Sequence, residues 1–305
     1  MGDNYSEKVF NPFHGVSPKD FQTEIFKASL DEDFPRTTGG KKKYQVVILG
    51  AGKGTRLGVS YPKVLYELNY PNGRMSLLCN AVNNIKALKS VIDIDSTYLV
   101  IDREKKSFFD REIADTELKI IGLKPDDIRG TAVSINAVLP FINPNYETIF
   151  LWGDLALWRV ADLAAVVRTQ SGVKSCLAFC TRVKKSPYVA FLRTDEGVIS
   201  SVIHANEIDR YPDVAEQDCL SFVCTSKALS LLGKFIELYP SSGEVDFVHF
   251  IPFLSRAGLP VIGLPIVQEG TVYGLNTHER ATEINRSLGQ YSRDSYIKYF
   301  QDPMS

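Results

Sequence analysis

The sequence predicts an α/β fold whose central sheet is mixed but mostly parallel. An apolar run rich in β-branched residues, 46–49, stops at the glycine-rich segment that starts at Gly50. Strand-like segments follow at 96–102, 118–121 and 147–154, and helical segments are expected before the first and before the last of them. This order of strand, helix and strand is typical of a parallel sheet, in which binding sites lie at the carboxyl ends of the strands.

The remaining elements follow in order along the chain. Residues 19–30 could form one helix within a weakly periodic leader, and 63–68 reads as a short extended segment. Apolar spacing predicts helices over 75–88 and from about 129 to 138, and a helix that begins near Arg159. Residues 174–180, 188–193, 198–204 and 260–264 alternate as strands, and 195–197 is a hairpin turn. An apolar helix is expected after 244–247 and to about Ala257, and another from 279 to 288.

Length and composition favour one large domain that follows a leader. We therefore divide the chain of 305 residues into an extension, 1–42, and a domain, 43–305, with two halves, 43–170 and 171–290. The 35 basic and 36 acidic residues give a formal charge of −1, so no global field would attract nucleic acid or an anionic membrane. The absence of a long apolar run and the five unpatterned cysteines predict a cytoplasmic protein.

The segment from Gly50 to Lys63 is the most informative part of the sequence. Successive glycines let backbone N–H groups turn inward and bind phosphate oxygens, and Arg56 and Lys63 add positive charge nearby. Although Gly52-Lys53-Gly54-Thr55 looks like the end of a P-loop, that motif needs a glycine where this chain has Val47. The segment therefore predicts a triphosphate site of another kind.

Three later positions have both a functional and a structural interpretation. Asp154 follows the strand 147–154 and a glycine, which suits a ligand for a hard cation in a crevice, but an aspartate could also cap the next helix. Asn276 could offer an amide oxygen or cap the helix after it. Gly130-Thr131 opens a helix, either as an ordinary helix start or beside a ligand.

These motifs together resemble the nucleoside-diphosphate-sugar pyrophosphorylases, or sugar nucleotidyltransferases. Residues 50–56 are similar to the loop of N-acetylglucosamine-1-phosphate uridylyltransferases, and 54–63 to that of UDP-N-acetylglucosamine pyrophosphorylases. The resemblance covers 44 to about 290, and it implies a three-layer, Rossmann-like nucleotidyltransferase fold of the GT-A-like kind. It also implies an enzyme that transfers a nucleoside monophosphate from a nucleoside triphosphate, with UTP favoured, to a sugar 1-phosphate.

The resemblance assigns roles to individual residues. Arg56 and Lys63 would be the catalytic cations, and Asp154 and Asn276 would bind Mg²⁺. The half 43–170 would bind the nucleotide through Leu49, Gly50, Ala51, Gly52, Gly54, Thr55, Arg129, Gly130 and Thr131. The half 171–290 would bind the acceptor through Tyr188, Glu207, Asp218 and Glu244, although Glu207 and Asp218 could equally be solvated surface acids.

Departures from the family pattern leave other functions open. Ile128 replaces the usual glutamine before Gly130, and the acceptor half matches loosely from 176 to 253. A cytidylyltransferase that acts on a phosphonate or a phosphorylated alcohol therefore stays an alternative. A protein that senses nucleotides without catalysis is another, because fold does not determine function. The base, the acceptor and the oligomeric state are left undecided.

Overall fold

The computed structural model describes residues 42–52, 54–114, 116–205, 211–239, 244–265 and 273–304. The predicted helix at 19–30 and the predicted site residue Glu207 lie outside these residues. The division into an extension and two halves stays a prediction, although strands from both predicted halves join one sheet.

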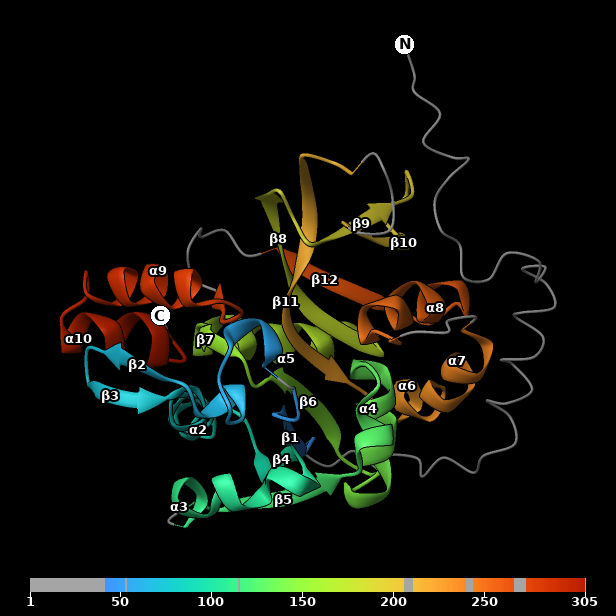
Figure 1. Cartoon of the computed structure of the whole chain (residues 1–305). Helices are drawn as coiled ribbons and strands as arrows, with labels where there is room; N and C mark the ends of the chain where they lie inside the picture. Colours follow the sequence, from blue (N-terminus) through green and yellow to red (C-terminus); the bar gives the residue numbers. More distant parts are fainter. Residues whose placement is uncertain are drawn as a thin grey trace.

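Within the described residues, the chain forms one seven-stranded sheet (Figure 1). All neighbouring strands are parallel except at β11, which runs antiparallel to both β6 and β8, so the predicted mixed, mostly parallel sheet is confirmed. In spatial order the strands are β12 (Val261–Pro265), β8 (Leu177–Lys185), β11 (Val214–Cys224), β6 (Glu147–Trp152), β1 (Tyr44–Leu49), β4 (Ile94–Asp102) and β5 (Leu118–Leu123).

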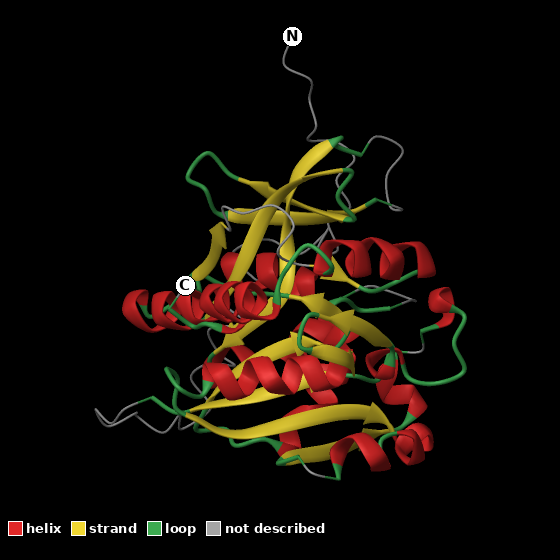
Figure 2. Ribbon diagram, turned by 90° about the vertical axis from the view of Figure 1, so that its left-hand side faces the viewer, coloured by secondary structure: helices red, strands yellow, loops and turns green. Residues whose placement is uncertain are grey.

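Helices cover both faces of this sheet and make a three-layer structure (Figure 2). In β1, Val46 and Ile48 pack into one buried cluster while Val47 packs into the other, because alternate side chains point to opposite faces. One face is covered by α2 (Leu77–Leu88) and α5 (Val160–Val173). The other is covered by α4 (Thr131–Val138), α6 (Ser226–Ser230), α7 (Leu232–Leu238) and α8 (Phe250–Arg256).

Small elements, among them separate two-stranded sheets, lie at the margins of the central sheet. A third apolar cluster joins the hairpin of β2 (Glu67–Tyr70) and β3 (Gly73–Ser76) to β7 (Leu155–Leu157), α9 (His278–Leu288) and α10 (Arg293–Tyr296). These lie together on the left of Figure 1. β7 pairs with β13 (Tyr273–Gly274), and β9 (Val189–Arg193) pairs with β10 (Ile199–His204) across the predicted turn. The short helix α3 (Asp110–Ile113) follows β4.

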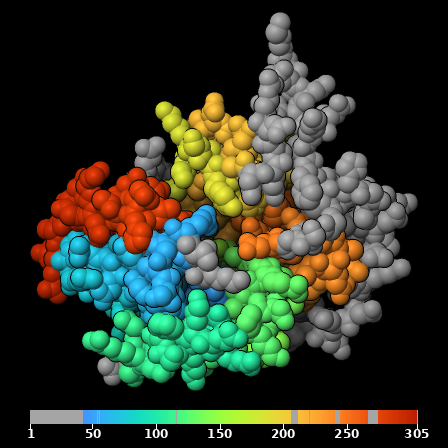
Figure 3. All heavy atoms as spheres, in the orientation of Figure 1, coloured from blue at the N-terminus to red at the C-terminus, as the bar shows by residue number. Residues whose placement is uncertain are grey.

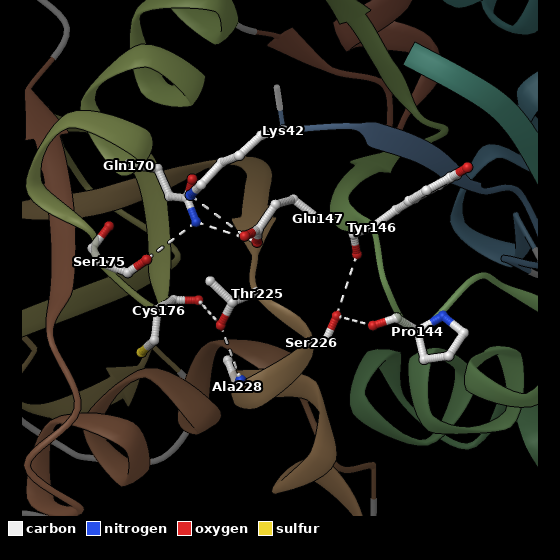
Figure 4. Close-up of polar contacts among 10 residues, drawn as sticks. All are labelled: Lys42, Pro144, Tyr146, Glu147, Gln170, Ser175, Cys176, Thr225, Ser226 and Ala228. Atoms are coloured by element: carbon white, nitrogen blue, oxygen red, sulfur yellow. Dashed lines mark hydrogen bonds and ion pairs between the residues drawn. The ribbon is translucent and has the colours of Figure 1, made fainter. Parts of the chain in front are cut away.

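A polar network ties the chain together where β6 begins, away from the strand ends that face the cavity described below (Figure 4). The Glu147 carboxylate lies 3.4 Å from the Lys42 ammonium and accepts a hydrogen bond from Gln170. Burial raises the pKa of Glu147, and the Lys42 charge opposes that rise. Thr225 donates to the carbonyl of Cys176 and caps α6. The network joins β6, α5, β8 and α6 and therefore serves stability.

Several predicted elements change at their boundaries. Residues 63–65 form a 3₁₀ turn, η3 (Lys63–Leu65), so only the end of the predicted extended segment 63–68 belongs to a strand. The predicted helix 75–88 starts at Leu77, because β3 continues to Ser76 and the Ser76 hydroxyl caps the helix. The strand β11 is absent from the predicted elements, because polar residues at 216–218 interrupt its apolar pattern.

Candidate active site

A cavity of about 820 Å³ opens at the carboxyl ends of β1 and β6. The register pairs Leu49 with Trp152, so the two strands end side by side and release their loops into the same space. Figure 3 shows blue, green, yellow and orange segments meeting around this face. Its lining residues are Leu49, Ala51, Gly52, Gly54, Arg56, Lys63, Val64, Val100, Pro125, Ile128, Arg129, Gly130, Thr131, Ser134, Trp152, Asp154, Tyr188, Glu244, Asp246 and Asn276.

The glycine-rich loop shapes one wall of the cavity. Gly54 has a φ of +67°, a conformation that favours glycine, and a Cβ on Gly52 would meet no atom within 4 Å. Gly50 has a different task, since its N–H donates to the Val100 carbonyl at 2.8 Å and it does not line the cavity. The backbone of Thr55 begins the 3₁₀ turn η2 (Thr55–Leu57), which also carries the exposed Arg56.

Lys63 contacts both predicted metal ligands, Asp154 and Asn276. Its ammonium lies 2.6 Å from Asp154 Oδ2 and donates to Asn276 Oδ1 at 3.1 Å. The two oxygens are therefore no further apart than these two distances added together. Lys63 thus meets two residues that lie 91 and 213 positions away from it in the sequence.

The backbone explains why Asp154 and Asn276 meet. The Leu275 N–H donates to the Asp154 carbonyl at 2.8 Å, beside the short β7–β13 ladder. A Cβ on Gly153 would lie 2.7 Å from the Leu49 carbonyl oxygen, so only glycine lets the chain turn here. Neither polar residue caps a helix: the cap of α5 is Arg159, and Thr277 caps α9 through its side chain. The capping alternatives for both residues are therefore wrong.

This pair of oxygens fits a magnesium ion. The second carboxylate oxygen, Asp154 Oδ1, is buried without a hydrogen-bond partner. Magnesium commonly binds one or two protein carboxylates and completes its shell with water and substrate phosphates. In the part of the chain that the structure describes, no group of three or more His, Cys, Asp or Glu side chains could hold a metal by itself. Any magnesium here would depend on oxygens that the substrate brings.

Gly130 and Thr131 lie at the seam between the two sides of the cavity. Gly130 has a φ of +103°, and a Cβ there would lie 2.5 Å from Val245 N and 2.6 Å from its oxygen. The Thr131 hydroxyl accepts from the Phe247 N–H at 2.7 Å and donates to Asp246 Oδ1 at 3.3 Å. Its hydrogen bonds thus hold the opposite wall, although Thr131 also lines the cavity.

The predicted acceptor residues separate into three groups. Tyr188 and Glu244 line the cavity, and the Tyr188 side chain is half exposed. Asp218 is buried within β11 and is absent from the lining, so the surface alternative for it is wrong and a direct contact with an acceptor has no support from its position. Glu207 lies outside the described residues. The sequence interpretation missed Asp246, which follows Glu244 by two positions and faces the same space.

Comparisons with known protein sequences match no family profile but give curated relatives that share one name. No profile of a known protein family matches the chain. The chain is 22% identical over 253 residues to the Bifunctional protein GlmU of Blochmanniella pennsylvanica and 25% identical over 253 residues to that of Paraburkholderia xenovorans. These matches cover 81% and 79% of the chain but 52% and 51% of the relatives, so the chain spans about half their length.

Two solved structures have a similar fold. One is the inositol-1-phosphate CTP transferase from T. maritima, with a TM-score of 0.57, and the other a putative glucose-1-phosphate thymidylyltransferase from Bacillus anthracis in complex with sucrose, with a TM-score of 0.63. Each is 17% identical, and each match covers 82% of this chain and 96% of the solved one. In sequence and in fold, the chain therefore resembles the sugar nucleotidyltransferases, as its motifs predict.

Proposed function

We propose that this protein transfers a nucleoside monophosphate from a nucleoside triphosphate to a sugar 1-phosphate and releases pyrophosphate. UTP is the favoured nucleotide, because the loop 50–56 resembles that of the uridylyltransferases. The observation that carries the proposal is the convergence of Lys63, Asp154 and Asn276 within one cavity, at the foot of the glycine-rich loop.

The reaction places few chemical demands on the protein. A phosphate oxygen of the acceptor attacks the α-phosphorus, the bond from that phosphorus to the bridging oxygen breaks, and the electron pair leaves with pyrophosphate. Such a transfer needs positioning and charge neutralisation rather than a covalent nucleophile. Two unit charges of like sign repel by about 4 kcal/mol at about 4 Å with an effective dielectric constant of 20. Bringing two phosphates into contact therefore requires cations.

The cations of the cavity lie where they could meet this requirement. The open backbone at Gly52 and Gly54 would accommodate the phosphates, and Arg56 would bind the β- and γ-phosphates from the same loop. Lys63 would neutralise charge at the α-phosphate. Its present partners, Asp154 and Asn276, supply oxygens that would hold Mg²⁺, which neutralises and orients phosphate oxygens when bound. Arg129 adds a further positive charge near the opposite wall.

A second function within the same class keeps specific support. Ile128 lines the cavity beside Gly130, where the family has a glutamine, and a structural neighbour is named as a CTP transferase. The alternative is a cytidylyltransferase that acts on a phosphonate or a phosphorylated alcohol.

Among the described residues, no helix combines the length and the apolar character that a membrane crossing needs. The cytoplasmic location stays a prediction.

Pyrophosphate release from a panel of substrates tests the proposal. UTP, CTP, ATP, GTP and dTTP would each be combined with hexose 1-phosphates, inositol 1-phosphate, 2-aminoethylphosphonate and phosphoethanolamine, with Mg²⁺ and with EDTA. We expect release with UTP and a hexose 1-phosphate, and its loss in EDTA. Release with CTP and a phospho-alcohol alone would select the cytidylyltransferase. If nucleotides raise the melting temperature and no pair releases pyrophosphate, the protein is a nucleotide sensor.

A further inference from the structure

The wall of the cavity opposite the glycine-rich loop carries negative charge. Glu244 and Asp246 both line it, and the Asp246 side chain is 35% exposed. Among the described residues, no lysine or arginine lies within ion-pair distance of either carboxylate. Arg56 and Lys63, by contrast, belong to the opposite side. Arg129 also lines the cavity near this wall, but its Nε–H donates to the Asp126 carbonyl at 3.1 Å and it forms no ion pair with Glu244 or Asp246. We call the wall that carries Glu244 and Asp246 the acidic side.

Asp246 is held in a defined position. Because the Thr131 hydroxyl accepts from Phe247 N–H, its proton is directed toward Asp246 Oδ1, 3.3 Å away. The other carboxylate oxygen lies 4.0 Å from Nε2 of the buried His204. One oxygen therefore accepts a hydrogen bond from the first residue of α4, and the other faces His204 at the end of β10.

A column of aromatic and histidine rings supports the same wall. The Tyr188 ring meets the His204 ring edge-on at 5.5 Å, His204 lies 4.9 Å from His249, and His249 lies 5.2 Å from Tyr239. The inner rings are buried, whereas Tyr188 is 54% exposed at the cavity. The exposed Tyr188 ring, supported by buried rings and near two carboxylates, suits the apolar face of a hydroxyl-bearing ring, or an ammonium group.

We propose that Asp246 determines which acceptors the protein accepts. It selects phosphorylated molecules whose far end carries hydrogen-bond donors, either hydroxyl or ammonium, and rejects those that carry a carboxylate there. A carboxylate has no proton to donate, and it would face Asp246 and Glu244 at close range, where like charges repel. This inference rests on the proposed function, since it takes the phosphate of the acceptor to lie near Lys63.

Pairs of acceptors that differ by one carboxylate test this inference. Glucose 1-phosphate and glucosamine 1-phosphate would be compared with glucuronic acid 1-phosphate, and phosphoethanolamine with phosphoserine. We expect kcat/KM to be at least about tenfold lower for the carboxylate member of the reactive series. Asp246→Asn keeps an oxygen that accepts hydrogen bonds and loses the negative charge. In this variant the ratio of kcat/KM between the two members of a pair should fall to within about threefold. The change should appear in KM, with kcat little altered.

Binding measurements separate this inference from the proposed function. Calorimetric titration of the same acceptors, in the presence of the α,β-methylene analogue of UTP or CTP, reports discrimination without turnover. Discriminating binding without pyrophosphate release would support the inference and overturn the proposed function. Turnover with equal kcat/KM for both members of each pair would support the proposed function and overturn the inference. Equal binding of both members, or no binding of any acceptor, would overturn the inference.

Two further variants guard against a structural explanation. Asp110→Asn changes an exposed acid of α3 that does not line the cavity, so its selectivity should match that of the unchanged protein. Glu244→Gln should narrow the ratio less than Asp246→Asn does, because the Glu244 side chain is more exposed. A loss of selectivity in Asp110→Asn equal to that in Asp246→Asn would contradict a specific role for Asp246.

Discussion

The two sides of the cavity are built by different means. The glycine-rich side uses a single continuous segment whose backbone follows from its glycines, with Lys63 placed by the turn η3. The acidic side combines Tyr188 with Glu244 and Asp246 of a second, distant segment, and Thr131 of α4 orients Asp246. A site made by backbone needs particular residues in a fixed order. A site made by side chains can be built from other residues of similar chemistry, and its sequence motif is therefore less specific.

The largest expected effect lies on the glycine-rich side. Lys63→Ala removes the ammonium that contacts Asp154 and Asn276, and we expect kcat for pyrophosphate release to fall about 10²–10³-fold, as for loss of one oxyanion-hole donor. Lys298→Ala, at an exposed lysine that does not line the cavity, is the matched control. Turnover at the wild-type rate in Lys63→Ala would contradict the assigned role.

A smaller effect is expected at the seam. In Gly130→Ala the new Cβ would collide with the Val245 backbone at 2.5 Å, and alanine is strained at a φ of +103°. We expect the free energy of unfolding, measured with urea, to fall by about 3 kcal/mol. Gly52→Ala adds the same atom where nothing lies within 4 Å and should change stability by less than about 0.5 kcal/mol. Equal losses in both variants would show that the contact with Val245 is unimportant.

The smallest effect concerns the ring column of the acidic side. Burial, with a contribution from His204, lowers the pKa of His249 from 6.5 to about 3. The unfolded chain binds a proton at His249 at a higher pH than the folded chain does. The free energy of unfolding is therefore not reduced by this histidine above about pH 6.5. It decreases as the pH falls from there toward 3, by at most about 1.4 kcal/mol per pH unit.

Denaturant unfolding between pH 7 and pH 4 measures this decrease. His249→Phe keeps a ring in the column and removes the titrating group, so its stability should fall less steeply with acid. His278→Phe, at an exposed histidine that begins α9, should keep the original slope. A slope in His249→Phe identical to that of the unchanged protein would place the acid sensitivity elsewhere.

Local patterns predicted much of the fold. Apolar periodicity predicts β1, β4, β5, β6, α2 and α4, because the spacing of apolar residues within each element shows which of its faces is buried. The sequence pattern does not predict β11, because its polar residues at 216–218 interrupt the apolar alternation. In the structure β11 pairs with β8 on one side and with β6 on the other. The pattern predicts an extended segment at Lys63–Leu65, but backbone hydrogen bonds from Leu65 to Pro62 and from Tyr66 to Lys63 close a 3₁₀ turn there.

For the site, the sequence by itself determined the glycine-rich loop, its two cations, and the two polar residues that end later segments. These follow from residue type and position relative to a strand end. Only the tertiary structure decided that Lys63 joins Asp154 to Asn276, that Gly50 bonds to the sheet, and that Asp246 faces the cavity while Asp218 is buried. Such facts depend on contacts between segments far apart in the chain, which local pattern does not encode.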